Sequence, residues 1–79
     1  MSQIEVGDFV LIPQHSVLYK KNETALYANS IIQEPTYAIF YGHHELDYGK
    51  VIINDLVWYV HIDSIFKGDR YVSPVNRSV

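Results

Sequence analysis

Two apolar runs separated by a two-residue polar break dominate the second half of the chain. They form the stretch VIINDLVWYVHIDSIF, from Val51 to Phe66, and the break is Asn54-Asp55. Both runs have the length of strands and are rich in β-branched and aromatic residues. Asn and Asp tolerate the left-handed backbone conformation that a tight turn needs. The pattern therefore predicts a β-hairpin that turns at Asn54-Asp55.

Other short apolar runs, each bounded by Gly, Pro, Asn or Asp, predict further strands. They are FVLIP from Phe9, VLY from Val17, TYAIFYG from Thr36 and RYVSPV from Arg70. Asp63-Ser64 is typical of the cap of a single helical turn before the last strand. For residues 20–35 two alternatives remain open: one or two helical turns capped by Asn22, or a long loop with an irregular strand at Ser30–Ile32. The spacing of turn residues is typical of a small all-β sandwich or barrel with about five strands.

Strand alternation predicts which side chains form the core. Trp58, Val60 and Ile62 share one face of their strand, and Val57, Tyr59 and His61 share the other. The aliphatic residues favour the first face as the inner one. The other predicted core residues are Val10, Ile12, Leu18, Ala38, Phe40, Val51, Ile53, Ile65 and Val72.

Composition limits the class of protein. Seventy-nine residues form a single domain, residues 1–79, and 48% hydrophobic residues are enough for a compact core. The absence of cysteine excludes disulfides and thiolate catalysis. The N-terminus lacks a basic segment followed by a long apolar one, and no apolar run reaches the ~20 residues that span a bilayer. We therefore expect a cytoplasmic protein without membrane contact.

The order of these patterns resembles the SH3-like (Src-homology-3-like) small β-barrel in its bacterial and phage versions. The resemblance rests on VGDFVLIP, VLYK, YAIFYG and GKVIINDLVWYVHIDSIF, where a strand ending in Trp-Tyr-Val runs into a short turn. It implies a five-stranded antiparallel barrel with a long early loop and a one-turn helix before the last strand. By analogy it also implies a phage-type accessory protein that acts on a host complex in the host cytoplasm. The Pro-x-x-Tyr signature of polyproline readers is absent, so no peptide-groove residues are transferred.

Residues suited to metal binding or catalysis do not form a recognisable motif. The most ligand-rich stretch is His43-His44-Glu45 with Asp47. Adjacent residues of an extended chain point to opposite sides, which favours a solvated loop over a metal site. The hydroxyl side chains considered as nucleophiles, none of which has a motif around it, are Ser16, Ser30, Ser64 and Thr36. We therefore expect no catalytic residue, no metal and no cofactor.

Tyrosine is frequent, with seven in the chain. Alternation places Tyr37, Tyr41 and Tyr59 on the outer side of adjacent strands, where large rings with a polar tip suit an interface. The alternative is that these rings only cover the outer wall and pair across strands. The predicted binding residues are Tyr37, Tyr41, Tyr48 and Tyr59 as anchors, with Glu45 and Asp47 at the rim.

These observations favour a non-enzymatic module that binds another protein, either a host protein or a second copy of itself. An exposed first or last strand with apolar residues such as Leu11 provides one route to a homo-oligomer. The alternative function is a small nucleic-acid-binding barrel associated with transcription or translation. Six basic residues and a net charge of −3 disfavour that alternative, because phosphate binding needs clustered positive charge.

Overall fold

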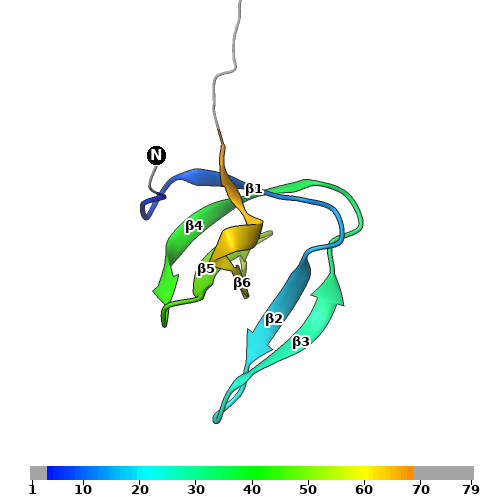
Figure 1. Cartoon of the computed structure of the whole chain (residues 1–79), viewed down its shortest axis with the longest axis vertical. Helices are drawn as coiled ribbons and strands as arrows, with labels where there is room; N and C mark the ends of the chain where they lie inside the picture. Colours follow the sequence, from blue (N-terminus) through cyan, green and yellow to red (C-terminus); the bar gives the residue numbers. More distant parts are fainter. Residues whose placement is uncertain (1–3, 69–79) are drawn as a thin grey trace, which may run out of the picture.

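Short β-forming runs pair into one antiparallel sheet of seven strands in the computed structural model, which describes residues 4–68 (Figure 1). The strands are β1 (Phe9–Ile12), β2 (Val17–Lys21), β3 (Leu26–Ile31), β4 (Thr36–His44), β5 (Tyr48–Ile53), β6 (Leu56–His61) and β7 (Phe66–Lys67). Their order across the sheet is β3-β2-β6-β5-β4-β1-β7. The all-β prediction is therefore confirmed.

The predicted number of five strands is wrong, because the sheet also contains β3, of six residues, and β7, of two. The one-turn helix is confirmed as a 3-10 turn, η1 (Ile62–Ser64), which comes before β7. The predicted cap at Asp63-Ser64 is wrong, because both residues lie inside the turn and its N-cap is His61, without a side-chain cap hydrogen bond. The predicted last strand at residues 70–75 lies outside the described residues. Within residues 4–68 no pairing joins β3 to β7, so closure into a barrel stays a prediction.

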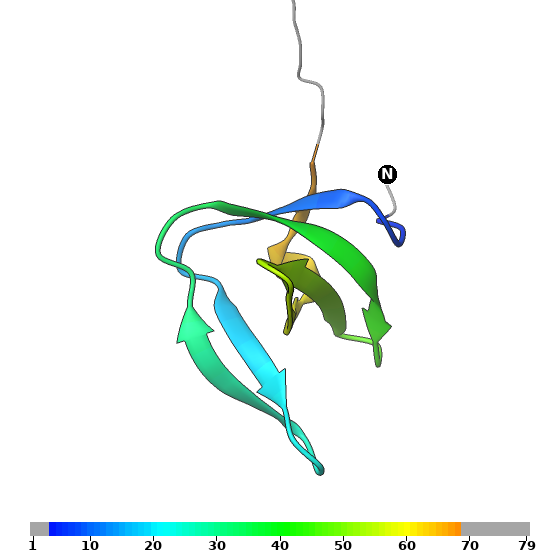
Figure 2. The ribbon, with the colours of Figure 1, turned by 180° about the vertical axis from the view of Figure 1, so that it is seen from behind.

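Residues 20–35 form no helix, and the strand considered at Ser30–Ile32 is in fact a longer one, β3 (Leu26–Ile31), which includes Ser30 and Ile31. Most of them belong to the β2–β3 hairpin, which projects away from the other strands (Figures 1 and 2). Asn22 does act as a cap, but of a turn: its Oδ1 accepts hydrogen bonds from the backbone N–H groups of Thr24 and Ala25, both at 2.9 Å. Its backbone N–H donates to the carbonyl of Ala25. The turn returns the chain antiparallel to β2, and pairing with β2 then outweighs the helical propensity of the sequence.

The predicted hairpin at Asn54-Asp55 is confirmed. Asn54 and Asp55 have φ values of +52° and +68°, and Ile53 pairs with Leu56 across the two-residue turn. Positive φ at both central residues defines the turn whose twist matches that of the flanking strands. It sets a register in which Val51 lies opposite Trp58, so the inner faces of β5 and β6 coincide.

The core lies on one side of the curved sheet, and its prediction from alternation is largely confirmed. The buried residues are Val10, Ile12, Leu18, Ile32, Ala38, Phe40, Val51, Val60 and Ile65, with Ile53, Trp58 and Ile62 packed against them. Ile32 is buried but is not among the predicted core residues, because the irregular strand considered at Ser30–Ile32 did not define an inner face. Val72 lies outside the described residues.

Glycine is required where β4 and β5 meet the core. A Cβ at Gly49 would lie 2.8 Å from Cε1 of Phe40 and 3.3 Å from Cδ1 of Ile62. The Phe40 ring is buried and can pack there only because Gly49 has no side chain. Gly42, at φ +143°, follows the bulge that interrupts the β4–β5 pairing after Phe40. The bulge leaves Tyr41 as an extra residue on β4.

Candidate protein-binding surface

Apolar side chains form a continuous strip on the face of the sheet that points away from the core, called here the outer face. Residues directly opposite each other in the register project from the same face, with Cβ atoms about 5 Å apart. One row runs Phe66–Leu11–Tyr37 across β7, β1 and β4. A second row runs Phe9–Ile39–Ile52–Val57 across β1, β4, β5 and β6. With Tyr41, these residues make up the apolar strip.

The apolar strip is open to solvent. The exposed fractions are 65% for Tyr37, 58% for Phe66, 53% for Tyr41 and 52% for Phe9. Scattered apolar residues are normal on a protein surface, whereas a contiguous apolar patch marks an interaction site. The cross-strand register makes this patch contiguous over five strands.

An aromatic cluster continues the outer face beyond the strip. It consists of Tyr19, His44, Tyr48, Tyr59 and His61. The rings of Tyr19, Tyr48 and His61 are mutual neighbours, with centroids 4.6–5.6 Å apart. His44 packs against Tyr59 with centroids 4.8 Å apart, and the Tyr19 hydroxyl lies 3.3 Å from Nε2 of His61. Because these rings pack against one another, most of them are half-buried, whereas the aromatic rings of the neighbouring strip are exposed.

The four predicted anchors lie on this one outer face but differ in environment. Tyr37 and Tyr41 stand exposed in the strip, whereas Tyr48 and Tyr59 are half-buried in the cluster. Lys50 joins the two parts, since it lies opposite Tyr59 and its Nζ is 5.5 Å from the centroid of the Tyr41 ring. The prediction that Tyr37 and Tyr41 lie on a strand adjacent to that of Tyr59 is wrong, because β5 lies between β4 and β6.

The predicted rim residues lie in the β4–β5 turn, at the end of the aromatic cluster. Glu45 has a left-handed φ of +59° and a side chain that is 75% exposed, with Oε2 3.8 Å from Nε2 of His44. The carbonyl of Asp47 accepts a hydrogen bond from the N–H of Ile62, which ties the turn to η1. Both acidic residues therefore border the cluster and not the strip, which begins at the other end of β4.

The expected solvated loop is wrong for the two histidines, because His43 and His44 are the last residues of β4, where they point to opposite faces as in any extended chain. The His43 ring packs against Phe40, with centroids 5.2 Å apart, while His44 packs on the outer face against Tyr59. Between residues 4 and 68 no group of three or more His, Asp or Glu side chains is placed to hold a metal ion. Two hydroxyls considered as nucleophiles make local hydrogen bonds: Ser30 Oγ donates to Asn29 Oδ1 and Thr36 Oγ1 donates to the carbonyl of Glu34.

Several residues of this surface were not predicted as binding residues. Phe9, Ile39 and Val57 could have been found, because each alternates with a predicted core residue and so must face outward. Tyr19 could not, because its neighbours come from the pairing of β2 with β6 across 40 positions of chain, Tyr19 to Tyr59. No local pattern reports that pairing.

The chain was compared with protein-family models, curated proteins and solved structures, and no significant match was found. What the surface can do is therefore inferred from its own residues. No helix in the described part of the chain has the length and apolar character to cross a bilayer.

Proposed function

We propose that this chain is a non-enzymatic protein-binding module that presents the outer face of its sheet to a partner protein. The observation that carries the proposal is the apolar strip, in which Phe9, Tyr37, Tyr41 and Phe66 are each more than half exposed. Aromatic residues of this kind dominate the energetics of protein interfaces. The SH3-like order of elements and the phage-type accessory role are parts of the proposal that rest on the sequence alone.

The size of the strip supports this role. At about 200 Å² for a full aromatic side chain, the four exposed rings together leave about 450 Å² open to solvent. A standard interface buries about 800 Å² on each partner, so these rings supply more than half of one side. The aromatic cluster lies beside the strip, with the acidic rim at its far end, and provides further contact area.

The charges of the surface favour a protein over a nucleic acid as partner. Lys67 pairs with Asp8 at 3.5 Å, and Lys20 lies over Trp58 with Nζ 4.0 Å from the ring centroid. Among residues 4–68, Lys50 lies next to Tyr41 beside the strip, and Lys21 lines a pocket with His44 and Tyr48 of the cluster. A phosphate backbone needs a run of positive charge along its path, and two separate lysines do not provide it.

The proposal is tested by capturing partner proteins from cells that express the gene, with the wild type and matched variants of this protein as bait. Three exposed tyrosines are substituted: Tyr37 and Tyr41, which lie in the strip, and Tyr27, which lies in β3 outside the strip. A protein retained by the wild type and by Tyr27→Ser, but lost with Tyr37→Ser and with Tyr41→Ser, is the expected result. Equal retention by all variants, or no protein retained, contradicts the proposal. Salt-sensitive binding of single-stranded oligonucleotides with no protein partner would instead favour the nucleic-acid alternative.

A further inference from the structure

The two ends of the sheet differ in how well they are protected against pairing with another strand. An edge strand exposes unpaired backbone N–H and C=O groups, and proteins usually shorten such strands or place charges on them. At one end, β7 is two residues long and its Lys67 is held by Asp8. At the other end, β3 is six residues long, Leu26–Ile31, and contains neither a charged residue nor proline. Among the described strands, β3 is therefore the open edge.

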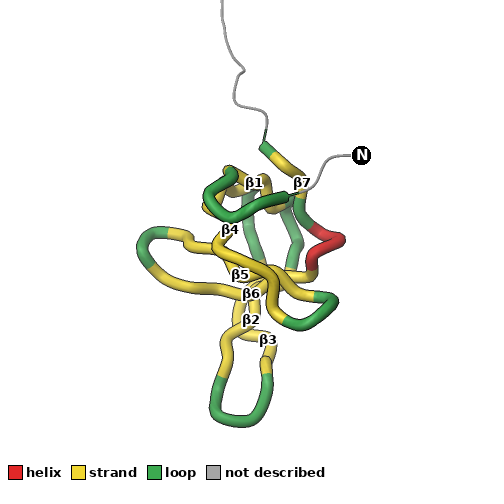
Figure 3. The backbone as a smooth tube through the Cα atoms, turned by 90° about the vertical axis from the view of Figure 1, so that its left-hand side faces the viewer, coloured by secondary structure: helices red, strands yellow, loops and turns green. Residues whose placement is uncertain are grey.

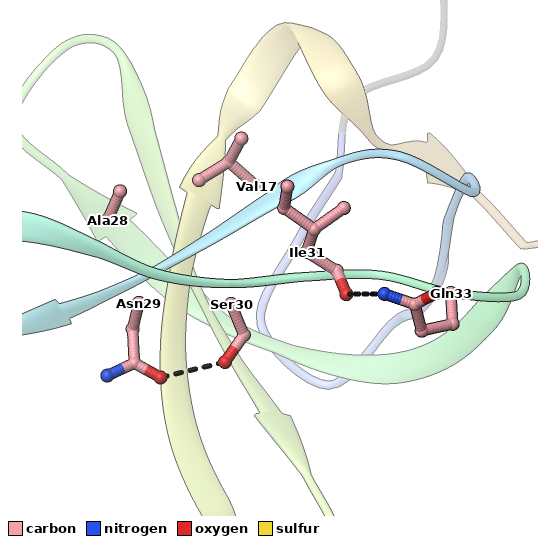
Figure 4. Close-up of a pocket in the computed structure, with 6 residues that line it drawn as sticks. All are labelled: Val17, Ala28, Asn29, Ser30, Ile31 and Gln33. Carbon is pink, nitrogen blue, oxygen red and sulfur yellow. Dashed lines mark hydrogen bonds between the residues drawn. The ribbon is translucent and has the colours of Figure 1, made fainter.

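Backbone hydrogen bonds show which side of β3 is free near its end. Ile32 donates to the carbonyl of Ser16 and accepts from the N–H of His15, so its backbone groups face the β2 side. Carbonyl directions alternate along an extended chain, so the carbonyl of Ile31 points to the opposite side. There it accepts a hydrogen bond from Nε2 of Gln33 at 3.2 Å (Figure 4). A side-chain amide thus occupies the position where a neighbouring strand would place its N–H.

An open cavity of about 460 Å³ lies beside the same edge (Figure 4). It is lined by Val17, Ala28, Asn29, Ser30, Ile31 and Gln33. The small side chains in the middle of β3 let another backbone approach closely, and Ile31 is 54% exposed. The β2–β3 hairpin also projects from the rest of the molecule, so the edge is open to a second chain (Figure 3).

We propose that β3 pairs antiparallel with β3 of a second copy of this chain, which joins two sheets into one across a two-fold axis. A second copy fits because it carries the same uncharged strand with the same outward-facing backbone groups, so one symmetric contact can pair both edges. The net charge of −3 opposes self-association at any surface, and β3 adds no acidic residue to that repulsion. This site is separate from the apolar strip.

The bulge in β3 limits the strength of the contact. The β2–β3 register shifts after Leu18, which leaves Asn29 as the extra residue. A bulge interrupts a ladder, so the new pairing consists of two short stretches on either side of Asn29. The contact is also smaller than a standard interface. We therefore expect a dissociation constant between about 10 µM and about 1 mM.

Sedimentation equilibrium of the wild type and of two matched variants tests the proposal. Ile31→Lys adds a charge to the edge, and Ile39→Lys adds the same charge to the apolar strip, where Ile39 is 40% exposed. The expected result is a concentration-dependent dimer that Ile31→Lys weakens about tenfold or more and Ile39→Lys leaves intact. A wild type that stays monomeric up to about 1 mM, or a dimer lost only with Ile39→Lys, overturns the proposal.

Hydrogen exchange of the wild type gives a second test that does not depend on the folding of a variant. Amides of β3 should gain protection as the protein concentration rises, while those of β1 and β4 should not. Protection gained on β1 and β4 instead would assign the dimer to the apolar strip. Failure of this proposal leaves the protein-binding function untouched, because that function is tested by loss of a partner with Tyr37→Ser.

Discussion

Substitution of Gly49 by alanine should destabilise the protein by about 1–3 kcal/mol, the usual cost of adding a methyl group to a packed core. The new Cβ would lie 2.8 Å from Cε1 of Phe40. The Phe40 ring cannot move away easily, because Phe40 is 1% exposed and its ring also packs against His43. For a chain of this length a total stability of about 4–12 kcal/mol is expected, so the loss is a substantial fraction.

A double-mutant cycle with Phe40→Leu isolates this contact. The smaller side chain removes the ring that the new Cβ would meet, so Gly49→Ala should cost at least about 1 kcal/mol less in the Phe40→Leu background than in the wild type. Urea denaturation followed by the fluorescence of Trp58 measures all four proteins. Trp58 is the only tryptophan and packs against the core, so its emission reports unfolding. Additive effects of the two substitutions would refute the steric reasoning.

The other predictions concern turns and the outer face, and the same urea denaturation measures them. Asp55→Gly should raise the free energy of unfolding by about 0.5 kcal/mol, because relief of the backbone strain at a φ of +68° exceeds the entropic cost of glycine. A loss of stability would contradict this reasoning. Asn22→Ala should lower the free energy of unfolding by about 1 kcal/mol, since the backbone N–H groups of Thr24 and Ala25 lose their acceptor. An unchanged free energy would mean that water replaces the Asn22 side chain as acceptor. Tyr37→Ser should change the free energy of unfolding by less than about 0.5 kcal/mol, because the Tyr37 side chain is largely exposed. A larger loss would mean that Tyr37 stabilises the fold and is not mainly a binding residue.

Much of the fold can be predicted from the local pattern of residue types along the chain. The turn at Asn54-Asp55 and the inward direction of Val60 depend on residue type and on a period of two, and both follow from neighbouring positions alone. The β2–β3 hairpin was missed because Asn22 caps a helix and a tight turn with the same chemistry. Which of the two forms is decided by β2, a strand that gives the segment something to pair with.

The binding surface, too, could be predicted from the sequence only in part. Alternation along β4 is enough to predict that Tyr37 and Tyr41 face outward, since each is next to a buried residue. The alignment of Phe9, Phe66 and Val57 with them, and the contacts of Tyr19 with Tyr48 and His61, follow only from the folded sheet. Alternation along one strand sets the face on which a side chain lies, whereas the neighbours of that side chain are set by strand order and register across the whole sheet.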